Sequence, residues 1–161
     1  MSTNSSSELQ PSGLGGWLIL VGIGLFVGPI RLLSYMSQTY PPIFRDGTWE
    51  NLTTPDSDFY HQLWAPIVIS EMIGNALIIA AGVYLIILFF RRSPRFPRLY
   101  VAVLIASLIF TVVNAWLVTL VLPTEPMFDS DTAKEFWRAF LFSAVWGPYM
   151  LLSKRVKNTF V

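Results

Sequence analysis

The chain has 161 residues, of which 53% are apolar and only 13% are charged, and its mean hydropathy is +0.54. A soluble domain carries about 25% charged residues, so this composition excludes an ordinary soluble protein and indicates a protein of the lipid bilayer. The net charge is only +1 and cysteine is absent, which excludes disulfide bonds, thiolate nucleophiles and thiolate metal sites.

The first residues are polar and rich in serine, which predicts a disordered tail over residues 1–12 and a membrane domain over residues 13–161. The first apolar run covers residues 14–36 and has no basic residue before Arg31, so it lacks the positive start of a signal peptide. We expect a retained helix there. Its glycines are spaced for close helix packing; packing within the bundle is the preferred interpretation, and a homo-oligomer is the alternative.

The first loop contains a turn signal. Asp46-Gly47 lies between apolar residues within residues 41–52, and this pattern is typical of a β-hairpin. Because an isolated hairpin is marginal in water, we expect it to rest on the outer ends of the helices as a short periplasmic cap.

Three further apolar runs predict helices over residues 62–90, 99–122 and 134–152. About 20 residues cross the hydrocarbon core, so the last run is marginal, and Arg138 must reach outward for that helix to span. Backbone groups in lipid need internal partners, which a helix supplies, and no run alternates with a period of two. The predicted fold class is an all-α membrane protein with a bundle of four transmembrane helices.

Charges predict the orientation. Residues 91–98 hold four arginines and no acid, and the tail over residues 153–161 holds three basic residues and no acid. The loops over residues 37–61 and 123–135 each hold four acidic residues and a single basic one. Basic loops stay in the cytoplasm, so we expect both termini there. The four arginines could also touch anionic lipid headgroups, but they give no support for nucleic-acid binding.

Polar residues within the apolar runs predict a cluster inside the membrane. Glu71 lies within the second run, and Asn75 lies one turn deeper on the same helix face. Asn114 in the third run, Arg31 in the first and Arg138 in the fourth lie at a comparable depth. Because a lone charge in hydrocarbon costs several kcal/mol, we expect these side chains to gather in the outer half of the bundle.

This cluster has two interpretations. In the structural one, Glu71 pairs with Arg31 or Arg138, and the asparagines join helices through hydrogen bonds. In the functional one, the cluster is a ligand, ion or proton site that opens outward, and two arginines beside one carboxylate would favour an anionic ligand. The single histidine, His61, is too few for a metal site, so no metal or cofactor is expected.

Several segments resemble a known family of bacterial inner-membrane proteins, catalogued as domain of unknown function 2569. The resemblance covers nearly the whole chain from Leu14 onward and implies the bacterial inner membrane, but it implies no reaction. It is carried by the following segments: Gly15-Gly16-Trp17-Leu18, Gly28-Pro29-Ile30-Arg31, Trp49-Glu50-Asn51-Leu52-Thr53 leading to Tyr60-His61 and Trp64, Glu71 with Asn75, Trp146-Gly147-Pro148-Tyr149, and the ending from Ser153 to Val161.

The expected function is that of an accessory or receptor-like protein, which recognises a protein partner or a small ligand, anionic ligands included, from the periplasmic side. The alternative is a small transporter or channel subunit that uses Glu71 as an ion or proton relay. An enzyme is not expected, because the sequence offers no nucleophile–base pair and no metal-ligand cluster.

Overall fold

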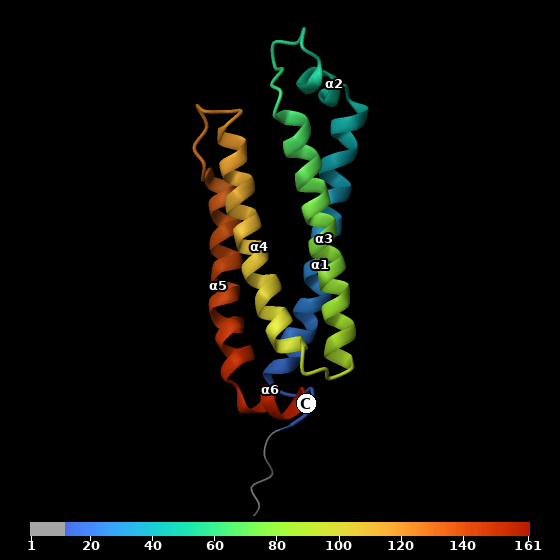
Figure 1. Ribbon diagram of the computed structural model, residues 1–161, viewed down its shortest axis with the longest axis vertical. Helices are drawn as coiled ribbons and strands as arrows, with labels where there is room; N and C mark the ends of the chain where they lie inside the picture. The colour runs from blue at the N-terminus through green and yellow to red at the C-terminus, as the bar shows by residue number, and fades with distance from the viewer. Residues whose placement is uncertain (1–11) are drawn as a thin grey trace, which may run out of the picture.

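The computed structural model describes residues 12–161, and every regular element in that range is a helix. Nearly all of the tail predicted over residues 1–12 lies outside the described residues. Two short helices lie at opposite ends of four long ones (Figure 1). The long helices are α1 Trp17–Arg45, α3 Trp64–Phe90, α4 Phe96–Thr119 and α5 Ser130–Leu152; the short ones are α2 Thr48–Thr53 and α6 Lys154–Thr159.

The long helices form two packed pairs. Helix α1 packs against α3, helix α4 packs against α5, and α3 joins the pairs through its contacts with α4. Figure 1 shows the two pairs close together near α6 and diverging toward the α2 end. The molecule is therefore tightest at one end and more open at the other.

The hydrophobic core lies at the α6 end. It includes Leu18 and Val21 of α1, which are fully buried, and a group of aromatic rings from α3, α4 and the end of the chain. The ring of Phe96 lies 5.2 Å from that of Phe89 and 4.7 Å from that of Phe160. The Gly13 backbone N–H donates to Thr159 Oγ1 at 2.9 Å, so the two described ends of the chain meet at this end.

Three helices, α1, α3 and α4, are long and apolar enough to cross a membrane, and they indicate a multi-pass membrane protein. The prediction of a fourth transmembrane helix is wrong, because α5 does not meet this measure although it has 23 residues. Charged residues occupy its first turns as far as Arg138, and Gly147-Pro148 lies in its second half. The apolar run is marginal in length already, and these residues leave α5 less apolar than the three spans.

The predicted β-hairpin cap is also wrong, because the described residues contain no strand. Helix α1 continues through Pro41 and Pro42, and Asp46 ends it by donating its N–H to the Pro42 carbonyl at 2.9 Å. Gly47 then takes a left-handed conformation with φ 76°, as glycine commonly does just after a helix. Asp46-Gly47 therefore ends a helix instead of turning a hairpin, and the cap is α2.

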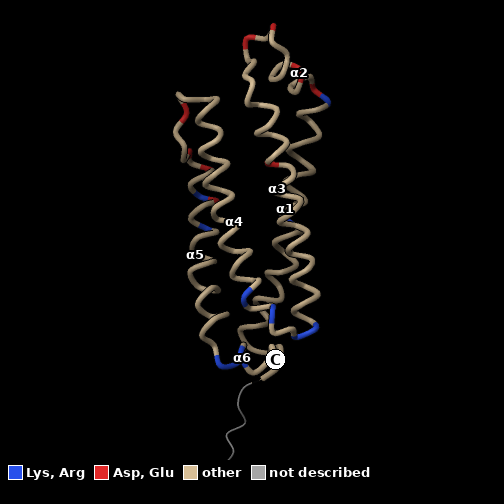
Figure 2. Tube along the Cα trace, in the orientation of Figure 1, with Lys and Arg blue, Asp and Glu red and all other residues tan. Residues whose placement is uncertain are grey.

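Charged residues divide between the two ends of the molecule. Figure 2 shows most basic residues gathered at the α6 end and most acidic residues toward the α2 end. The exceptions include α5, where Lys134 pairs with Asp131 at 3.0 Å and Arg138 with Glu135 at 3.3 Å on the exposed surface. The segregation seen along the sequence is thus also a segregation in space.

Asp129 caps the first turn of α5, since its Oδ1 accepts the Thr132 backbone N–H at 2.8 Å. Hydrogen bonds from Thr132 hold the pKa of Asp129 below its usual range. Because the folded pKa is lowered, the cap stabilises the helix above the unfolded pKa of about 3.9 and is lost as pH falls through the folded pKa.

We therefore expect the Thr132 amide to be protected from hydrogen exchange at pH 5 and to lose protection in stronger acid. Asp129→Asn keeps an acceptor, so its protection should not depend on pH, whereas Asp129→Ala should lose protection throughout. NMR hydrogen exchange in detergent measures all three proteins. Equal protection in the parent and in Asp129→Ala would contradict the capping role.

Candidate functional site

Four polar side chains join α1 to α3 in the half of the bundle nearer α2, and we call them the Glu71 cluster. Tyr35 Oη and Tyr40 Oη both donate to Glu71 Oε1, at 3.4 and 3.1 Å. Asn75 Nδ2 in turn donates to Tyr40 Oη at 2.8 Å. The carboxylate is therefore held by two phenols, and one of these phenols is itself fixed by an amide.

The cluster has a buried side and an open side. Tyr40 and Asn75 are only 5% and 6% exposed, whereas Tyr35 is 46% exposed and Glu71 is partly exposed. The two tyrosine rings meet edge to face, with centroids 6.3 Å apart. Tyr40 and Asn75 thus form the buried side of the cluster, and Glu71 and Tyr35 form its exposed side.

The predicted site residues are not all brought together. Tyr40 links Glu71 to Asn75, but within residues 12–161 no ion pair joins Glu71 to Arg31 or Arg138. Arg31 is exposed, and Arg138 pairs with Glu135 on its own helix. Asn114 is partly buried on α4, and no hydrogen bond connects it to the Glu71 cluster in this range.

The position of Glu71 along α3 explains why its carboxylate needs no arginine. Glu71 precedes Phe90, the last residue of α3, by 19 residues, which is about 29 Å of helix. The hydrocarbon core is about 30 Å thick. If the arginines after Phe90 mark one boundary, Glu71 lies near the other, where water can hydrate a carboxylate.

Sequence reasoning missed Tyr35 and Tyr40. The predicted helix ended at residue 36, whereas α1 continues to Arg45, and only this extension places Tyr40 beside α3. The sequence did contain a signal for Tyr40. A buried tyrosine hydroxyl usually has a hydrogen-bond partner, and Glu71 is the acid of the neighbouring apolar run.

The electrostatics of the cluster favour a cation. Both phenols donate to Oε1, and Glu71 Oε2 receives no hydrogen bond from the described residues. No basic side chain of residues 12–161 forms an ion pair with Glu71. An anionic ligand, which the sequence favoured on the assumption of two nearby arginines, would be repelled; a positively charged or hydrogen-bond-donating group would be attracted.

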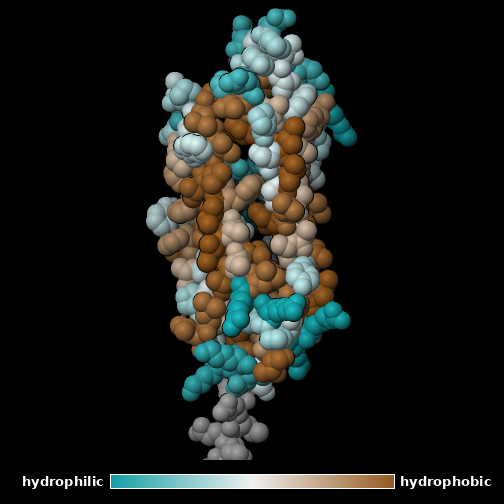
Figure 3. Space-filling model, viewed as in Figure 1, coloured by the Kyte–Doolittle hydropathy of each residue, from teal (hydrophilic) through white to brown (hydrophobic). Residues whose placement is uncertain are grey.

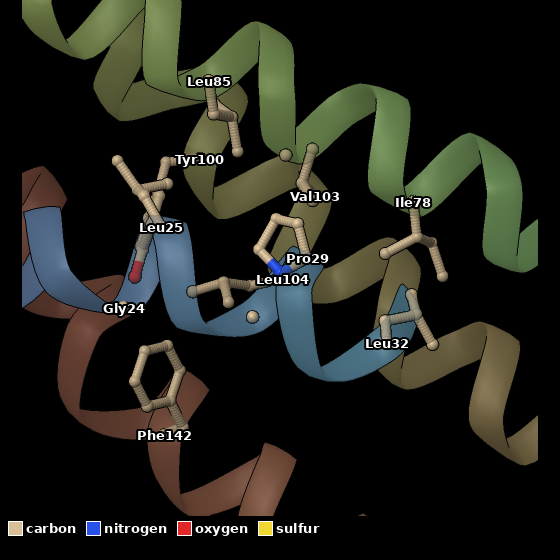
Figure 4. Close-up of a pocket in the computed structure, with 12 residues that line it drawn as sticks. Gly24, Leu25, Pro29, Leu32, Ile78, Leu85, Tyr100, Val103, Leu104 and Phe142 are labelled. Carbon is tan, nitrogen blue, oxygen red and sulfur yellow. The ribbon is translucent and has the colours of Figure 1, made fainter. Parts of the chain in front are cut away.

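An apolar groove lies next to the cluster, toward the α6 end. Its volume is about 210 Å³, and it is lined by all four long helices, including Leu32 of α1, Ile78 of α3, Leu104 of α4 and Phe142 of α5. Figure 3 shows the molecule hollowed between the two helix pairs, with mostly hydrophobic walls, and Figure 4 shows the side chains that point into the groove. The hydroxyl of Tyr100 is the exception to this apolar lining.

His61 has a local structural contact. Its Nδ1 accepts the Leu63 backbone N–H at 3.2 Å, just before α3 begins. Within residues 12–161 no three His, Cys, Asp or Glu side chains are grouped closely enough to hold a metal ion.

Comparison with known proteins bears on the whole chain. The model of a family described as "Protein of unknown function (DUF2569)" matches residues 11–161. This match confirms the resemblance carried by the segments around Trp17, Arg31, Glu71 and Trp146. No curated protein and no solved structure matches the chain.

Proposed function

The chain belongs to the DUF2569 family, whose function is unknown, and we propose its role from the site alone. The proposed role is that of an accessory or receptor-like protein of the bacterial inner membrane, which recognises a positively charged group from the periplasmic side. The observation that carries the proposal is the Glu71 carboxylate, which two tyrosines hold and no cation of the described residues neutralises.

The orientation rests on the charges. Basic residues gather at the α6 end (Figure 2), and basic ends of membrane helices stay in the cytoplasm. In this orientation the Glu71 cluster lies at the periplasmic boundary of the membrane, within reach of water-borne groups.

The distribution of titratable residues supports recognition over relay. Between Glu71 and the basic end, the three spans contain tyrosines and Arg31, but no further acid and no histidine. A proton path across the membrane normally uses a chain of acids or histidines. The transporter alternative therefore lacks a continuation below Glu71, while an outward-facing binding site needs none.

The lack of cysteine allows a direct test. A single Tyr35→Cys substitution places a thiol on the exposed side of the cluster, next to Glu71. In intact cells we expect the cationic-to-anionic rate ratio of membrane-impermeant methanethiosulfonates at this thiol to exceed the ratio in the Glu71→Gln background by at least about fivefold. This ratio corresponds to about 1 kcal/mol, the interaction of unit charges about 4 Å apart in water.

Two controls complete the test. Adding Glu71→Gln to Tyr35→Cys supplies that background, because it removes the Glu71 charge and keeps the thiolate, which itself favours the cationic reagent. Ser93→Cys, in the basic link between α3 and α4, should react only after the cells are permeabilised. A rate ratio that Glu71→Gln leaves unchanged, or labelling of Ser93→Cys in intact cells, would contradict the proposal.

A further inference from the structure

The groove and the Glu71 cluster share one face of α3. Glu71, Asn75, Ile78, Gly82 and Leu85 follow one another at intervals of four and three residues, which is the spacing of a single helix face. The last three of these line the apolar groove. The same face of α3 is therefore apolar toward the α6 end and carries the Glu71 carboxylate toward the α2 end.

Helix α1 supplies a matching stripe with a positive charge. Gly24, Gly28, Arg31 and Tyr35 follow at intervals of four, three and four residues, so they also share a face. Gly24 and Gly28 line the groove, and Tyr35 contacts Glu71. The exposed Arg31 lies between them, about 6 Å below Tyr35 along the axis.

The groove has room beside Gly28. A Cβ atom added at Gly28 would meet no atom within 4 Å. The surrounding side chains are apolar (Figure 4). A hydrocarbon segment would therefore leave no hydrogen-bonding group unsatisfied in the groove, whereas a water molecule would find few hydrogen-bond partners there. The groove thus fits part of an acyl chain.

We infer that groove, Arg31 and Glu71 form one binding site for an amine-headed phospholipid of the periplasmic leaflet. The order of the protein groups along the bundle is apolar groove, guanidinium, carboxylate; the order along such a lipid is acyl chain, phosphate, ammonium. An acyl chain lies in the groove, the phosphate lies beside Arg31, and the ammonium donates to Glu71. This inference rests on the proposed function, since it names the positively charged group that Glu71 recognises.

The test compares two lipids that differ only in the headgroup beyond the phosphate. Purified protein is incubated with palmitoyl-oleoyl phosphatidylethanolamine or with the corresponding phosphatidylglycerol, and bound lipid is counted by native mass spectrometry. We expect the parent to retain the ethanolamine lipid about fivefold better, the upper range for a hydrated ion pair. Glu71→Gln should retain both lipids equally, and Arg31→Gln should retain less of both.

A pair of glycine variants tests the groove. Gly28→Leu should fill it and reduce retention of both lipids. Gly147→Leu is the matched control: it too would place its Cβ in open space, but it lines a different hollow, between α4 and α5, and should retain lipid as the parent does. Melting curves of the variants exclude loss of fold as the cause.

Equal retention of the two lipids by the parent would overturn the inference, as would a preference that survives Glu71→Gln or retention unchanged by Gly28→Leu. These failures differ from failure of the proposed function. If the Glu71 charge raises the labelling ratio while the two lipids bind equally, Glu71 recognises a positive group that is not this lipid. If Glu71→Gln leaves the labelling ratio unchanged, the proposed function itself fails.

Discussion

Tyr40→Phe is expected to lower the free energy of unfolding by about 1–3 kcal/mol, the cost of leaving a buried polar group without its partner. The hydroxyl of Tyr40 accepts from Asn75 Nδ2 at 2.8 Å and donates to Glu71 at 3.1 Å. Asn75 is only 6% exposed, so water cannot easily replace the lost partner. The measurement is unfolding by SDS from detergent micelles, followed by circular dichroism.

Tyr35→Phe is the matched control. Its hydrogen bond to Glu71 is longer, at 3.4 Å, and its side chain is 46% exposed, so we expect a loss of less than about 0.5 kcal/mol, as for most surface changes. Glu71→Gln keeps an acceptor oxygen for both phenols and should also unfold near the parent. If Tyr35→Phe costs as much as Tyr40→Phe, the buried Tyr40–Asn75 contact is not what holds the cluster together.

The parts of the fold that sequence predicted well depend on local, periodic signals. The apolar runs of α1, α3 and α4 are long and contain few polar residues, so their length and composition mark them as spans. Glu71 and Asn75 were placed on one helix face because helical spacing alone fixes that relation. Both remain together in the structure, joined through Tyr40.

The errors arose where one local signal serves two geometries. Asp46-Gly47 fits a hairpin turn, but a glycine in the left-handed conformation ends a helix equally well. The choice depends on whether α1 continues through Pro41 and Pro42, which the contact between α1 and α3 supports and a short sequence window does not show. The ring of Phe44 packs 5.0 Å from that of Trp49 and holds α2 against α1.

The predicted partners of Glu71 depended on where the first helix ends. A first helix that ends at residue 36 places no Tyr40 beside Glu71, so an arginine was expected to pair with the carboxylate. A helix that reaches Arg45 brings Tyr40 alongside α3, where its hydroxyl donates to Glu71. The groove could not be predicted in any case, because four helices must be positioned before its walls exist.

Gly82→Val is expected to be among the most disruptive single substitutions in the bundle, with a loss of about 1–3 kcal/mol or more from overpacking. Gly82 is buried on α3, and a Cβ there would lie 2.7 Å from Pro29 Cγ of α1. The pyrrolidine ring is closed onto the backbone and cannot rotate away, so α1 and α3 themselves must separate. The same SDS unfolding measurement reports the loss.

A double-mutant cycle identifies the contact as the cause. Pro29→Ala removes the Cγ atom that a side chain at residue 82 would strike, so Gly82→Ala should cost clearly less in the Pro29→Ala background than in the parent. Gly147→Ala is the control for the change from glycine to alanine in a helix, because its Cβ would meet no atom within 4 Å. Its effect should stay within about 1 kcal/mol, because the gain in helix propensity is opposed by the contact of the new Cβ with the ring of Pro148. If Gly82→Ala also behaves in this way, or if its cost is the same with and without Pro29, then the close approach of α1 and α3 at this point does not limit their packing.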